Sequence, residues 1–293
     1  MKPRLLIIGV GRMGDALIRV IAPTQQAEIA IFDNDTTKYT AAFPLTELAA
    51  NADFIFLCIP ASAVRAVITE IKNHLSPEAV VVSLVKGLDE SGKSMNEILV
   101  ELLPRSEQSA ILAGPMLSGE LLQGQTAYGL VATAPTTYEK LQALFKPTLV
   151  HVEYSADRQG TSIAGVLKNV YAIGLGIASA LNLGANTQGK LVTQAIKEMT
   201  ALIPQLGGEA ATVLSLAGLG DLVATGSSSH SRNRTVGEEL IQNGHATTQS
   251  EGLVSLPLLT KRVSDLTPYP LLKTINEVVT SGADARRTFA NVL

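Results

Sequence analysis

Arg4-Leu-Leu-Ile-Ile-Gly9-Val-Gly11-Arg-Met-Gly14-Asp-Ala-Leu-Ile-Arg-Val-Ile21 is the stretch that decides the fold expected for this chain of 293 residues. It has the order of a short apolar strand, a glycine turn and a helix, which is the dinucleotide-binding fingerprint in its required context. Gly9 permits the tight turn, Gly11 lets backbone N–H groups approach a pyrophosphate, and Gly14 allows close packing of helix on strand. We therefore expect a nucleotide to bind along Gly9, Gly11, Arg12, Met13 and Gly14.

A second apolar run, Glu28–Phe32, predicts the next strand, and it ends in Asp33. An acid at this position accepts hydrogen bonds from the adenosine ribose hydroxyls, and it repels the 2′-phosphate of NADP. The sequence therefore favours NAD as the cofactor. NADP stays open because the nearby Lys38 could offset the repulsion.

The composition is that of a metabolic enzyme: 46% of residues are hydrophobic, 17% are charged, and the formal net charge is -3. The length suggests about two domains. Mild acidity, 4% aromatic residues and the lack of a long basic run argue against a nucleic-acid partner. The four histidines have no metal-ligand spacing, so no metal site is expected. The single cysteine, Cys58, lies in an apolar strand and is expected to be a buried small side chain.

No targeting or membrane segment is expected either. The basic start at Met1 leads into an apolar run that breaks at Gly9, and no small-residue cleavage site follows. The longest apolar stretch, Tyr171–Leu183, is interrupted by glycine and falls short of the roughly 18 residues that span a bilayer. The expected location is the cytoplasm.

Strand and helix patterns alternate in the first half of the chain, which predicts a mostly parallel, doubly wound sheet. Strands are expected at 4–9, 28–32, 53–59, 79–84, 109–113, 128–133 and 149–153, and helices at 15–22, 62–75, 95–103 and 136–146. After Glu153 the periodicity is helical, at 162–180, 187–205, 210–216, 236–243, 254–264 and 270–281. We expect a dinucleotide-binding domain over 1–154 and an all-helical substrate-binding and catalytic domain over 155–293.

The stretch from Gly218 to Arg234 combines an acid, hydroxyls, an amide and two guanidiniums, and its glycines and serines predict a loop. Arg offers a rigid fork that matches phosphate or carboxylate oxygens, and small polar side chains add hydrogen bonds. The pattern indicates a site for a small anion, with a solvated polar loop as the alternative.

Two lysines are candidates for chemistry. Lys86 follows a predicted strand at its carboxyl end, where open sheets bind ligands, although a surface lysine at a strand end gives the same pattern. Lys168 interrupts an apolar helix, which is costly unless the ammonium is paired, functional or reaches the rim of the protein.

These segments, taken in order, resemble the bacterial-type NAD(P)-dependent glycerol-3-phosphate dehydrogenases over most of the chain. The matching motifs are the glycine turn, Ile59-Pro60-Ala-Ser62, Lys86-Gly87, Gly114-Pro115, Val166-Leu-Lys168-Asn169, Gly218-Leu-Gly-Asp221-Leu, Ser231-Arg-Asn-Arg234 and Glu251-Gly252. The resemblance implies an N-terminal Rossmann-type sheet and a C-terminal domain like that of 6-phosphogluconate dehydrogenase. It also implies reduction of dihydroxyacetone phosphate to glycerol 3-phosphate for phospholipid synthesis, and a homodimer.

Carried over by position, the resemblance implies a role for each site residue. Lys168 is the catalytic lysine, with Lys86 and Asp221 beside it. The substrate-binding residues are Lys86, Gly114, Lys168, Asn169, Asp221, Thr225, Ser231, Arg232 and Asn233. The cofactor-binding residues, besides the glycine turn, are Asp33, Pro60, Lys86, Arg232 and Glu251. Desolvation and Lys86 would lower the pKa of Lys168 while Asp221 would oppose the shift, and the sequence leaves the balance open.

Three departures from the family pattern leave alternatives open. The chain between Asp33 and Asn51 is short, Met116-Leu117 replaces Ser-Phe, and Gln194-Ala195 replaces Arg-Gly. Because the last two segments are expected to border the cleft, the substrate could be a relative of dihydroxyacetone phosphate. Another reductase of the same two-domain design, similar to ketopantoate or pyrroline-carboxylate reductase, remains an alternative, as does a non-catalytic NADH-binding regulator.

Overall fold

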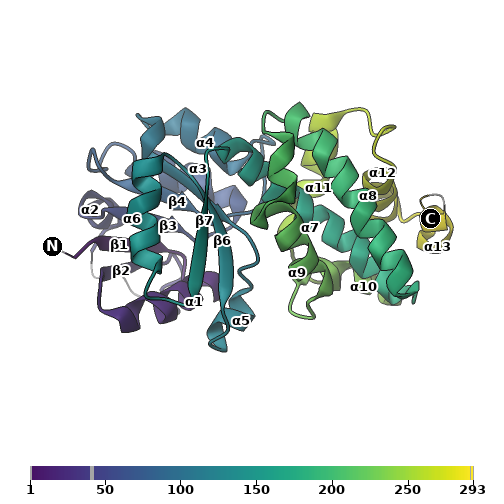
Figure 1. The fold of residues 1–293 in the computed structure, drawn as a ribbon, viewed down its shortest axis with the longest axis horizontal. Coiled ribbons are helices and arrows are strands. Elements are labelled where there is room, and N and C mark those ends of the chain that lie inside the picture. The colour runs from purple at the N-terminus through teal and green to yellow at the C-terminus, as the bar shows by residue number, and fades with distance from the viewer. Residues whose placement is uncertain (1, 40–42, 291, 293) are drawn as a thin grey trace. The chain divides into compact units, whose positions relative to one another are not determined.

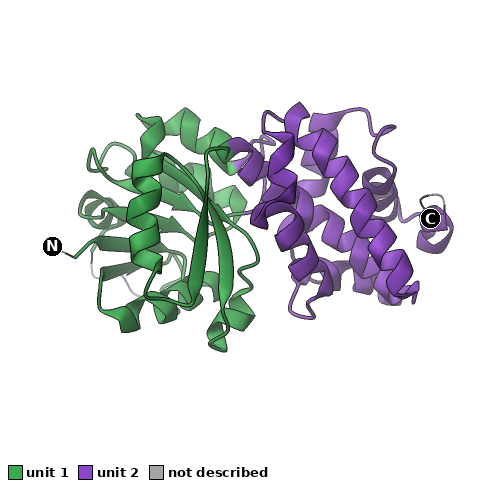
Figure 2. Cartoon of the chain, in the orientation of Figure 1, with its two compact units in different colours: residues 1–85, 95–158 green, residues 86–94, 159–293 purple. Residues whose placement is uncertain are grey.

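The computed structural model describes residues 2–39, 43–290 and 292, and the chain forms two compact units (Figures 1 and 2). The first unit is made of residues 1–85 and 95–158, and the second of residues 86–94 and 159–293. The short segment 86–94 therefore leaves the first unit and belongs to the second by its contacts. Residues 40–42, in the short stretch between Asp33 and Asn51, lie outside the described residues.

The first unit is built on a sheet whose strands are β1 (Arg4–Ile8), β2 (Glu28–Phe32), β3 (Phe54–Leu57), β4 (Val80–Ser83), β5 (Ser109–Ala113), β6 (Ala127–Ala132) and β7 (Val150–Ser155). Within the described residues the sheet has seven strands in the order β2-β1-β3-β4-β5-β6-β7. Neighbouring strands are parallel except β5 and β6, which are antiparallel. The prediction of a mostly parallel, doubly wound sheet is confirmed.

Helices cover both faces of this sheet (Figure 1). One face packs against α1 (Arg12–Ile21), α5 (Ser118–Leu122) and α6 (Pro135–Phe145), and the other against α2 (Leu45–Ala50), α3 (Ala61–Ile71) and α4 (Met95–Leu102). In β1, Leu5 and Ile7 face the first layer while Leu6 and Ile8 face the second. Burial on both faces explains why the strands are continuous apolar runs. Helices α2 and α5 escaped prediction because five or six residues are too few to show helical periodicity.

The second unit is helical. Its helices are α7 (Arg158–Ala180), α8 (Gly184–Gln205), α9 (Asp221–Ser227), α10 (Arg232–Asn243), α11 (Glu251–Val263), α12 (Pro270–Ser281) and α13 (Ala285–Ala290). Helix α7 is longer than the apolar run in the sequence, and by length and composition it could cross a membrane. However, 89% of its apolar window is buried inside the protein, so α7 is the core helix of this unit.

The glycine-rich stretch from Gly218 to Arg234 is mostly helical, so the expectation of a loop was wrong. A π-helical turn (Leu216–Gly220) leads directly into α9, and only a short turn separates α9 from α10. The reason lies in packing: a Cβ on Gly218 would overlap the carbonyl oxygen of Val213. The glycine there serves close approach of backbone to backbone rather than flexibility.

Candidate active site

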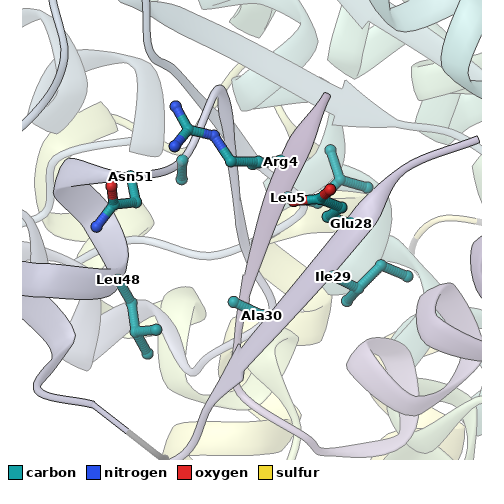
Figure 3. A pocket seen from close by; sticks show the side chains of 8 residues that line it. Arg4, Leu5, Glu28, Ile29, Ala30, Leu48 and Asn51 are labelled. Carbon is teal, nitrogen blue, oxygen red and sulfur yellow. The ribbon is translucent and has the colours of Figure 1, made fainter. Parts of the chain in front are cut away.

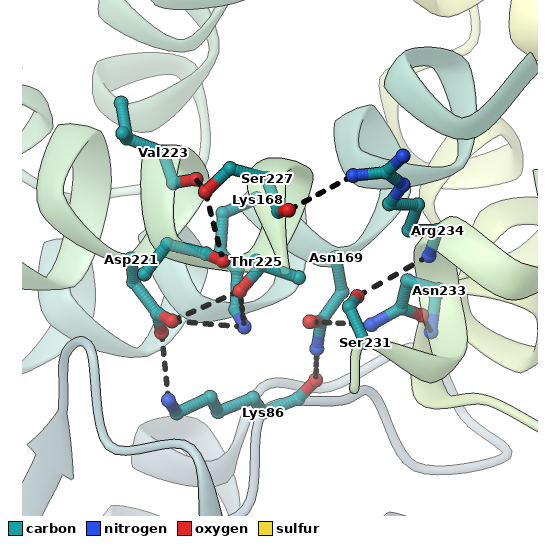
Figure 4. A network of polar contacts seen from close by, with 12 residues as sticks. Lys86, Lys168, Asn169, Asp221, Val223, Thr225, Ser227, Ser231, Asn233 and Arg234 are labelled. Atoms are coloured by element: carbon teal, nitrogen blue, oxygen red, sulfur yellow. Dashed lines mark hydrogen bonds and ion pairs between the residues drawn. The ribbon is translucent and has the colours of Figure 1, made fainter. Parts of the chain in front are cut away.

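A buried lysine stands at the centre of the second unit. Lys168 of α7 is 4% exposed, and its Nζ donates a hydrogen bond of 2.8 Å to Oγ1 of Thr225 and lies 3.1 Å from Oδ1 of Asp221 (Figure 4). Thr225 Oγ1 in turn donates to the same carboxylate oxygen at 3.1 Å. Asp221 and Thr225 lie four residues apart at the start of α9, so one helical turn presents both toward the ammonium.

Lys86 provides a second ammonium on the other oxygen of the same carboxylate. Its Nζ lies 2.6 Å from Oδ2 of Asp221, and its side chain is 17% exposed. Asp221 is fully buried, so two cations share one desolvated acid. Each of these charges has a partner, and removal of one partner would leave an uncompensated buried charge, which is strongly destabilising.

The protonation of Lys168 reflects this balance. Burial lowers the pKa of Lys168 to about 8; Asp221 opposes the shift and the ammonium of Lys86 adds to it. Burial alone would raise the pKa of Asp221, but Lys168 and Lys86 outweigh it and hold that pKa below its usual value. Desolvation therefore outweighs Asp221 at Lys168, and the pKa of this lysine lies below its usual value.

Two buried asparagines form a chain of amide hydrogen bonds next to the lysines. Asn169 Nδ2 donates to the carbonyl oxygen of Lys86 at 2.8 Å, and Asn233 Nδ2 donates to Oδ1 of Asn169 at 2.8 Å. The backbone N–H of Gly252 donates to Oδ1 of Asn233 at 3.0 Å. This chain joins α7, α10 and α11 to the segment that carries Lys86 (Figure 4).

The residues at the start of α10 have different tasks. Ser231 caps the helix, since its Oγ accepts from the backbone N–H of Arg234 at 3.2 Å. Arg232 occupies the first helical position and is exposed. The Arg234 guanidinium binds groups within the second unit. It forms an ion pair with Glu238 at 2.8 Å and donates to the carbonyl oxygen of Ser227 and to Oγ of Ser179, both at 2.9 Å. Of the two guanidiniums in this motif, Arg232 is the one at the surface.

The glycine turn of the first unit has the geometry of a nucleotide cradle. Gly9 has φ of 95°, and a Cβ there would lie 2.6 Å from the carbonyl oxygen of Cys58. A Cβ on Gly14 would overlap the carbonyl oxygen of Gly9, while a Cβ on Gly11 would meet open space. The start of α1 carries no side-chain cap at Gly11. Its first N–H groups are thus available for an anion.

Asp33 closes this turn from the end of β2. Its Oδ2 accepts from the backbone N–H of Val10 at 2.6 Å, and its Oδ1 accepts from that of Asp35 at 2.8 Å. Lys38 lies 3.0 Å from Asp35 in an exposed ion pair. Asp33 therefore has a structural task at the turn in addition to the ribose contact expected from the sequence.

The remaining candidates lie at element ends. Arg12 is the first residue of α1 and exposed, and Met13 packs partly against the core. Pro60 precedes α3, and Glu251 begins α11. Gly114 follows β5 with φ of 143°, where a Cβ would lie 2.6 Å from the carbonyl oxygen of Tyr128.

Two of the family departures combine packed and partly exposed residues. Met116 is 3% exposed and belongs to the hydrophobic core of the first unit. Gln194 donates from Nε2 to Oε1 of Glu198 at 2.9 Å, and Ala195 is buried. Met116 and Ala195 therefore take part in packing inside their units, while Leu117 and Gln194 are partly exposed, and the expectation that both segments border a substrate cleft stays a prediction.

Sequence reasoning missed Glu198, a carboxylate that is 2% exposed in α8. It accepts from the hydroxyl of Tyr171 at 2.8 Å and from the backbone N–H groups of Leu271 and Leu272 at 2.7 and 2.9 Å. It thus caps the first turn of α12 from another helix. The helical spacing of the sequence indicates that Glu198 is buried, because it falls on the same helix face as the apolar Leu191, Ala195 and Leu202.

A separate cavity of about 250 Å³ lies in the first unit at the amino ends of β1 and β2 (Figure 3). Its lining residues are Arg4, Leu5, Glu28, Ile29, Ala30, Leu48, Asn51 and Ala52. The glycine turn follows the opposite end of β1, so this cavity is distinct from the nucleotide cradle. Among residues 2–39, 43–290 and 292, no cluster of metal-ligating side chains occurs. Burial raises the pKa of the Cys58 thiol to about 12, which disfavours a thiolate nucleophile.

Comparison with known proteins gives the family. Residues 36–138 match the model "NAD-dependent glycerol-3-phosphate dehydrogenase N-terminus", and residues 157–290 match the corresponding C-terminus. A glycerol-3-phosphate dehydrogenase [NAD(P)+] of Mycobacterium tuberculosis is 39% identical over 264 residues, which cover 82% of this chain and 76% of the relative. One from Azotobacter vinelandii is 32% identical over 321 aligned residues, which cover 99% and 92%.

With these matches, the chain, built from a parallel sheet unit and a helical unit, is an NAD(P)-dependent oxidoreductase. The chain belongs to the NAD(P)-dependent glycerol-3-phosphate dehydrogenase family and is an enzyme of that activity, with NAD(P) as coenzyme. The glycerol-3-phosphate dehydrogenase of Coxiella burnetii has the same fold, with a TM-score of 0.87, 24% identity and coverage of 99% of this chain and 98% of that one. A ketopantoate reductase of Ralstonia eutropha shares the fold with a TM-score of 0.62, 15% identity and 99% coverage of both chains. Membership of this family excludes the two alternatives considered from the sequence, a reductase of another family and a non-catalytic NADH-binding regulator.

Proposed function

We propose that Lys168 is the general acid in the reduction of dihydroxyacetone phosphate to sn-glycerol 3-phosphate. The observation that carries this proposal is the buried ammonium held between Thr225 and Asp221. Hydride arrival at the carbonyl carbon builds negative charge on the oxygen, and an ammonium within hydrogen-bond reach stabilises that charge and delivers a proton. A pKa of about 8 for Lys168 suits this task, because the group is protonated at neutral pH yet releases its proton readily.

Lys86 and Asp221 complete the proposed catalytic set. Asp221 fixes the direction of both ammonium groups, since each of its oxygens holds one lysine. Lys86 keeps the pKa of Lys168 low and adds positive charge for the substrate. Thr225 orients Lys168 through its hydroxyl. A site with two cations and one buried acid carries net positive charge, which favours a phosphorylated substrate.

Arg232 is the proposed anchor for the substrate phosphate. It is exposed at the first position of α10, where helical N–H groups add a partial positive charge. The further proposed substrate-binding residues are Gly114, Asn169, Thr225, Ser231 and Asn233. Asn169 and Asn233 each have a second amide N–H beyond the bonds described above, so they can bind substrate while they hold the helices together.

The glycine turn suits the cofactor, which supplies the hydride when bound. The open space at Gly11 and the uncapped start of α1 are the cradle that a pyrophosphate needs. Asp33 can accept ribose hydroxyls in addition to its two backbone donors, since a carboxylate has about four lone-pair sites. Arg12, Met13, Pro60, Lys86, Arg232 and Glu251 are the other proposed cofactor-binding residues.

NAD is the proposed preferred cofactor. The carboxylate of Asp33 opposes a 2′-phosphate, and Lys38 already has Asp35 as an ion-pair partner. Catalytic efficiency with NADH is therefore expected to exceed that with NADPH, and Asp33→Ala is expected to narrow the ratio. A strong preference of the wild type for NADPH would contradict the proposal.

A cytoplasmic homodimer that supplies glycerol 3-phosphate for phospholipid synthesis is the proposed setting. It follows from the resemblance to the family rather than from a particular contact. Light scattering should give twice the chain mass of 30.8 kDa. A monomer mass across the working concentration range would contradict the dimer.

The proposed chemistry is tested with NADH and dihydroxyacetone phosphate by the loss of nicotinamide absorbance. Lys168→Ala is expected to lose roughly 10²- to 10⁴-fold in kcat, since that is the usual contribution of a positioned general acid. NADH binding, measured by nicotinamide fluorescence, should stay near the wild-type value because the glycine turn lies in the other unit. Wild-type turnover in Lys168→Ala would overturn the assignment.

A further inference from the structure

Lys86 stands at the start of a compact hairpin within the segment Lys86–Ser94. Leu88 and Ser94 form an antiparallel bridge, and Gly92, with φ of 81°, donates its N–H to the carbonyl oxygen of Asp89 at 2.8 Å. Oδ1 of Asp89 accepts from the N–H and the hydroxyl of Ser91 at 3.0 and 2.6 Å and from the N–H of Lys93 at 2.9 Å. Asp89 is only 3% exposed. The carboxylate thus fixes the turn from inside.

The hairpin is tied to the helical unit by side chains of α11 and α7. Ser255, which is fully buried, accepts at Oγ from the backbone N–H of Leu88 at 3.2 Å. Arg262 donates from Nη1 to the carbonyl oxygen of Gly92 at 3.1 Å. Ser94 Oγ donates to Oε1 of Gln159 at 3.2 Å. The chain enters this segment from β4 and leaves it into α4, both of the first unit, and these bonds join it to the second unit, to which it belongs.

Three parts of Lys86 are fixed by contacts: its backbone carbonyl, its ammonium group and its aliphatic stem. Its carbonyl oxygen accepts from Asn169, and its Nζ contacts Asp221. Its stem passes α7 at Gly165, where a Cβ would lie 3.4 Å from the Cγ of Lys86. A lysine side chain is long and flexible, so fixing both ends removes most of the freedom that would otherwise scatter its charge.

We propose that the hairpin Leu88–Ser94, anchored by Ser255 and Arg262 and braced by Asp89, is a positioning device that keeps the Lys86 ammonium on Asp221. Ser255, Arg262 and Asp89 bond to the backbone of the segment, and they act on the Lys86 ammonium through that backbone. The inference rests on the proposed role of Lys86 and deepens it. Lys86 thereby stays part of the catalytic set in the helical unit, although its neighbours in sequence belong to the nucleotide-binding unit.

The cleanest test compares Arg262→Ala with Lys261→Ala. Both remove a long cation from adjacent positions of α11, but Lys261 is exposed whereas Arg262 donates to the hairpin backbone at Gly92. Arg262→Ala is expected to lower kcat for dihydroxyacetone phosphate roughly 10-fold, because small misplacements of a catalytic group are costly. Because Lys86 is also a proposed cofactor-binding residue, the KM for NADH should rise as well. Lys261→Ala should match the wild type in both.

The pH profile separates positioning from general damage. The charged groups around Lys168 are Asp221 of α9 and Lys86, and the Lys86 ammonium lowers the pKa of Lys168. Displacement of Lys86 lets that pKa rise, so the fall of kcat at alkaline pH should move to higher pH in Arg262→Ala. Lys86→Ala should move the alkaline fall of kcat in the same direction. A variant that only loses stability should leave the pH of this fall unchanged.

Asp89 gives a second pair of variants. Asp89→Ala removes the brace and is expected to reproduce the Arg262→Ala phenotype, while Asp89→Asn keeps an oxygen for the same donors and is expected to restore most of the activity. If Lys86→Ala shifts the profile but Arg262→Ala and Asp89→Ala do not, the positioning device is overturned and the role of Lys86 stands. If Lys86→Ala changes neither kcat nor the profile, the proposed role of Lys86 fails and this inference falls with it.

Discussion

At the scale of single residues, the decisive quantity is the charge on Lys168. Burial favours the neutral amine, and Asp221 favours the ammonium; the result is a pKa of about 8. In the proposed mechanism the reduction needs the protonated form of Lys168, so its rate should fall as pH rises through about 8. The opposite reaction needs the neutral amine and should gain over the same range.

Asp221→Asn should shift this behaviour in a defined direction. The substitution removes the anion that raises the pKa of Lys168 and leaves the opposing ammonium of Lys86 in place. The alkaline fall in the reduction rate should therefore move to lower pH, by about one unit or more. The measurement is kcat against pH, with circular dichroism to confirm folding. A shift to higher pH would contradict the electrostatic account.

Arg232 permits a test of phosphate recognition that needs no structural change elsewhere. It is exposed at the start of α10, so Arg232→Ala should fold normally. Loss of a charge-assisted contact to phosphate should raise the KM for dihydroxyacetone phosphate by roughly 10- to 100-fold. Turnover of unphosphorylated dihydroxyacetone should change little. Equal losses on both ketones would assign Arg232 another task.

At the scale of elements, the helical unit depends on glycines that let backbones touch. A Cβ on Gly176 of α7 would overlap the carbonyl oxygen of Arg234, and a Cβ on Gly237 of α10 would overlap that of Ile173. The two helices therefore meet through reciprocal glycines, which brings Asn233 of α10 within hydrogen-bond reach of Asn169 of α7.

Gly237→Ala should separate these helices and destabilise the protein by at least about 2 kcal/mol, because backbone cannot move aside as a flexible side chain can. Gly189→Ala, in α8, is the matched control: it is exposed, and a Cβ there meets no atom within 4 Å. That variant should gain about 0.4–1 kcal/mol through helix propensity. Urea denaturation followed by circular dichroism measures both. Equal stability of the two variants would show that the close contact is not important.

At the scale of the whole molecule, the sequence predicted what depends on local pattern. The seven strands and the long helices follow from apolar runs and periodicity, since both faces of the sheet and all sides of α7 are buried. The pairing of Lys168 with Asp221 came from family motifs and not from spacing, because 53 positions separate the two residues.

What the sequence could not predict depends on long-range packing. In the sequence Gly218 indicates a loop, but in the structure it allows close approach to the carbonyl oxygen of Val213. Met116 lies next to a family motif, yet its side chain fills the core. Lys86 follows a strand of the first unit, yet its contacts with Asn169 and Asp221 lie in the second, and the hairpin after it bonds to Ser255 and Arg262 of that unit.

The most direct test of the central claim is chemical rescue of Lys168→Ala. The buried site at Lys168 has room for a small amine once the side chain is removed, and Asp221 and Thr225 remain to hold it. We predict that methylammonium restores reduction of dihydroxyacetone phosphate by NADH in this variant in a saturable way, with no effect on the wild type. Tetramethylammonium, which has no proton to give, should restore nothing. Undiminished turnover of the variant without amine, or equal rescue by both cations, would contradict the assignment of Lys168 as the proton donor.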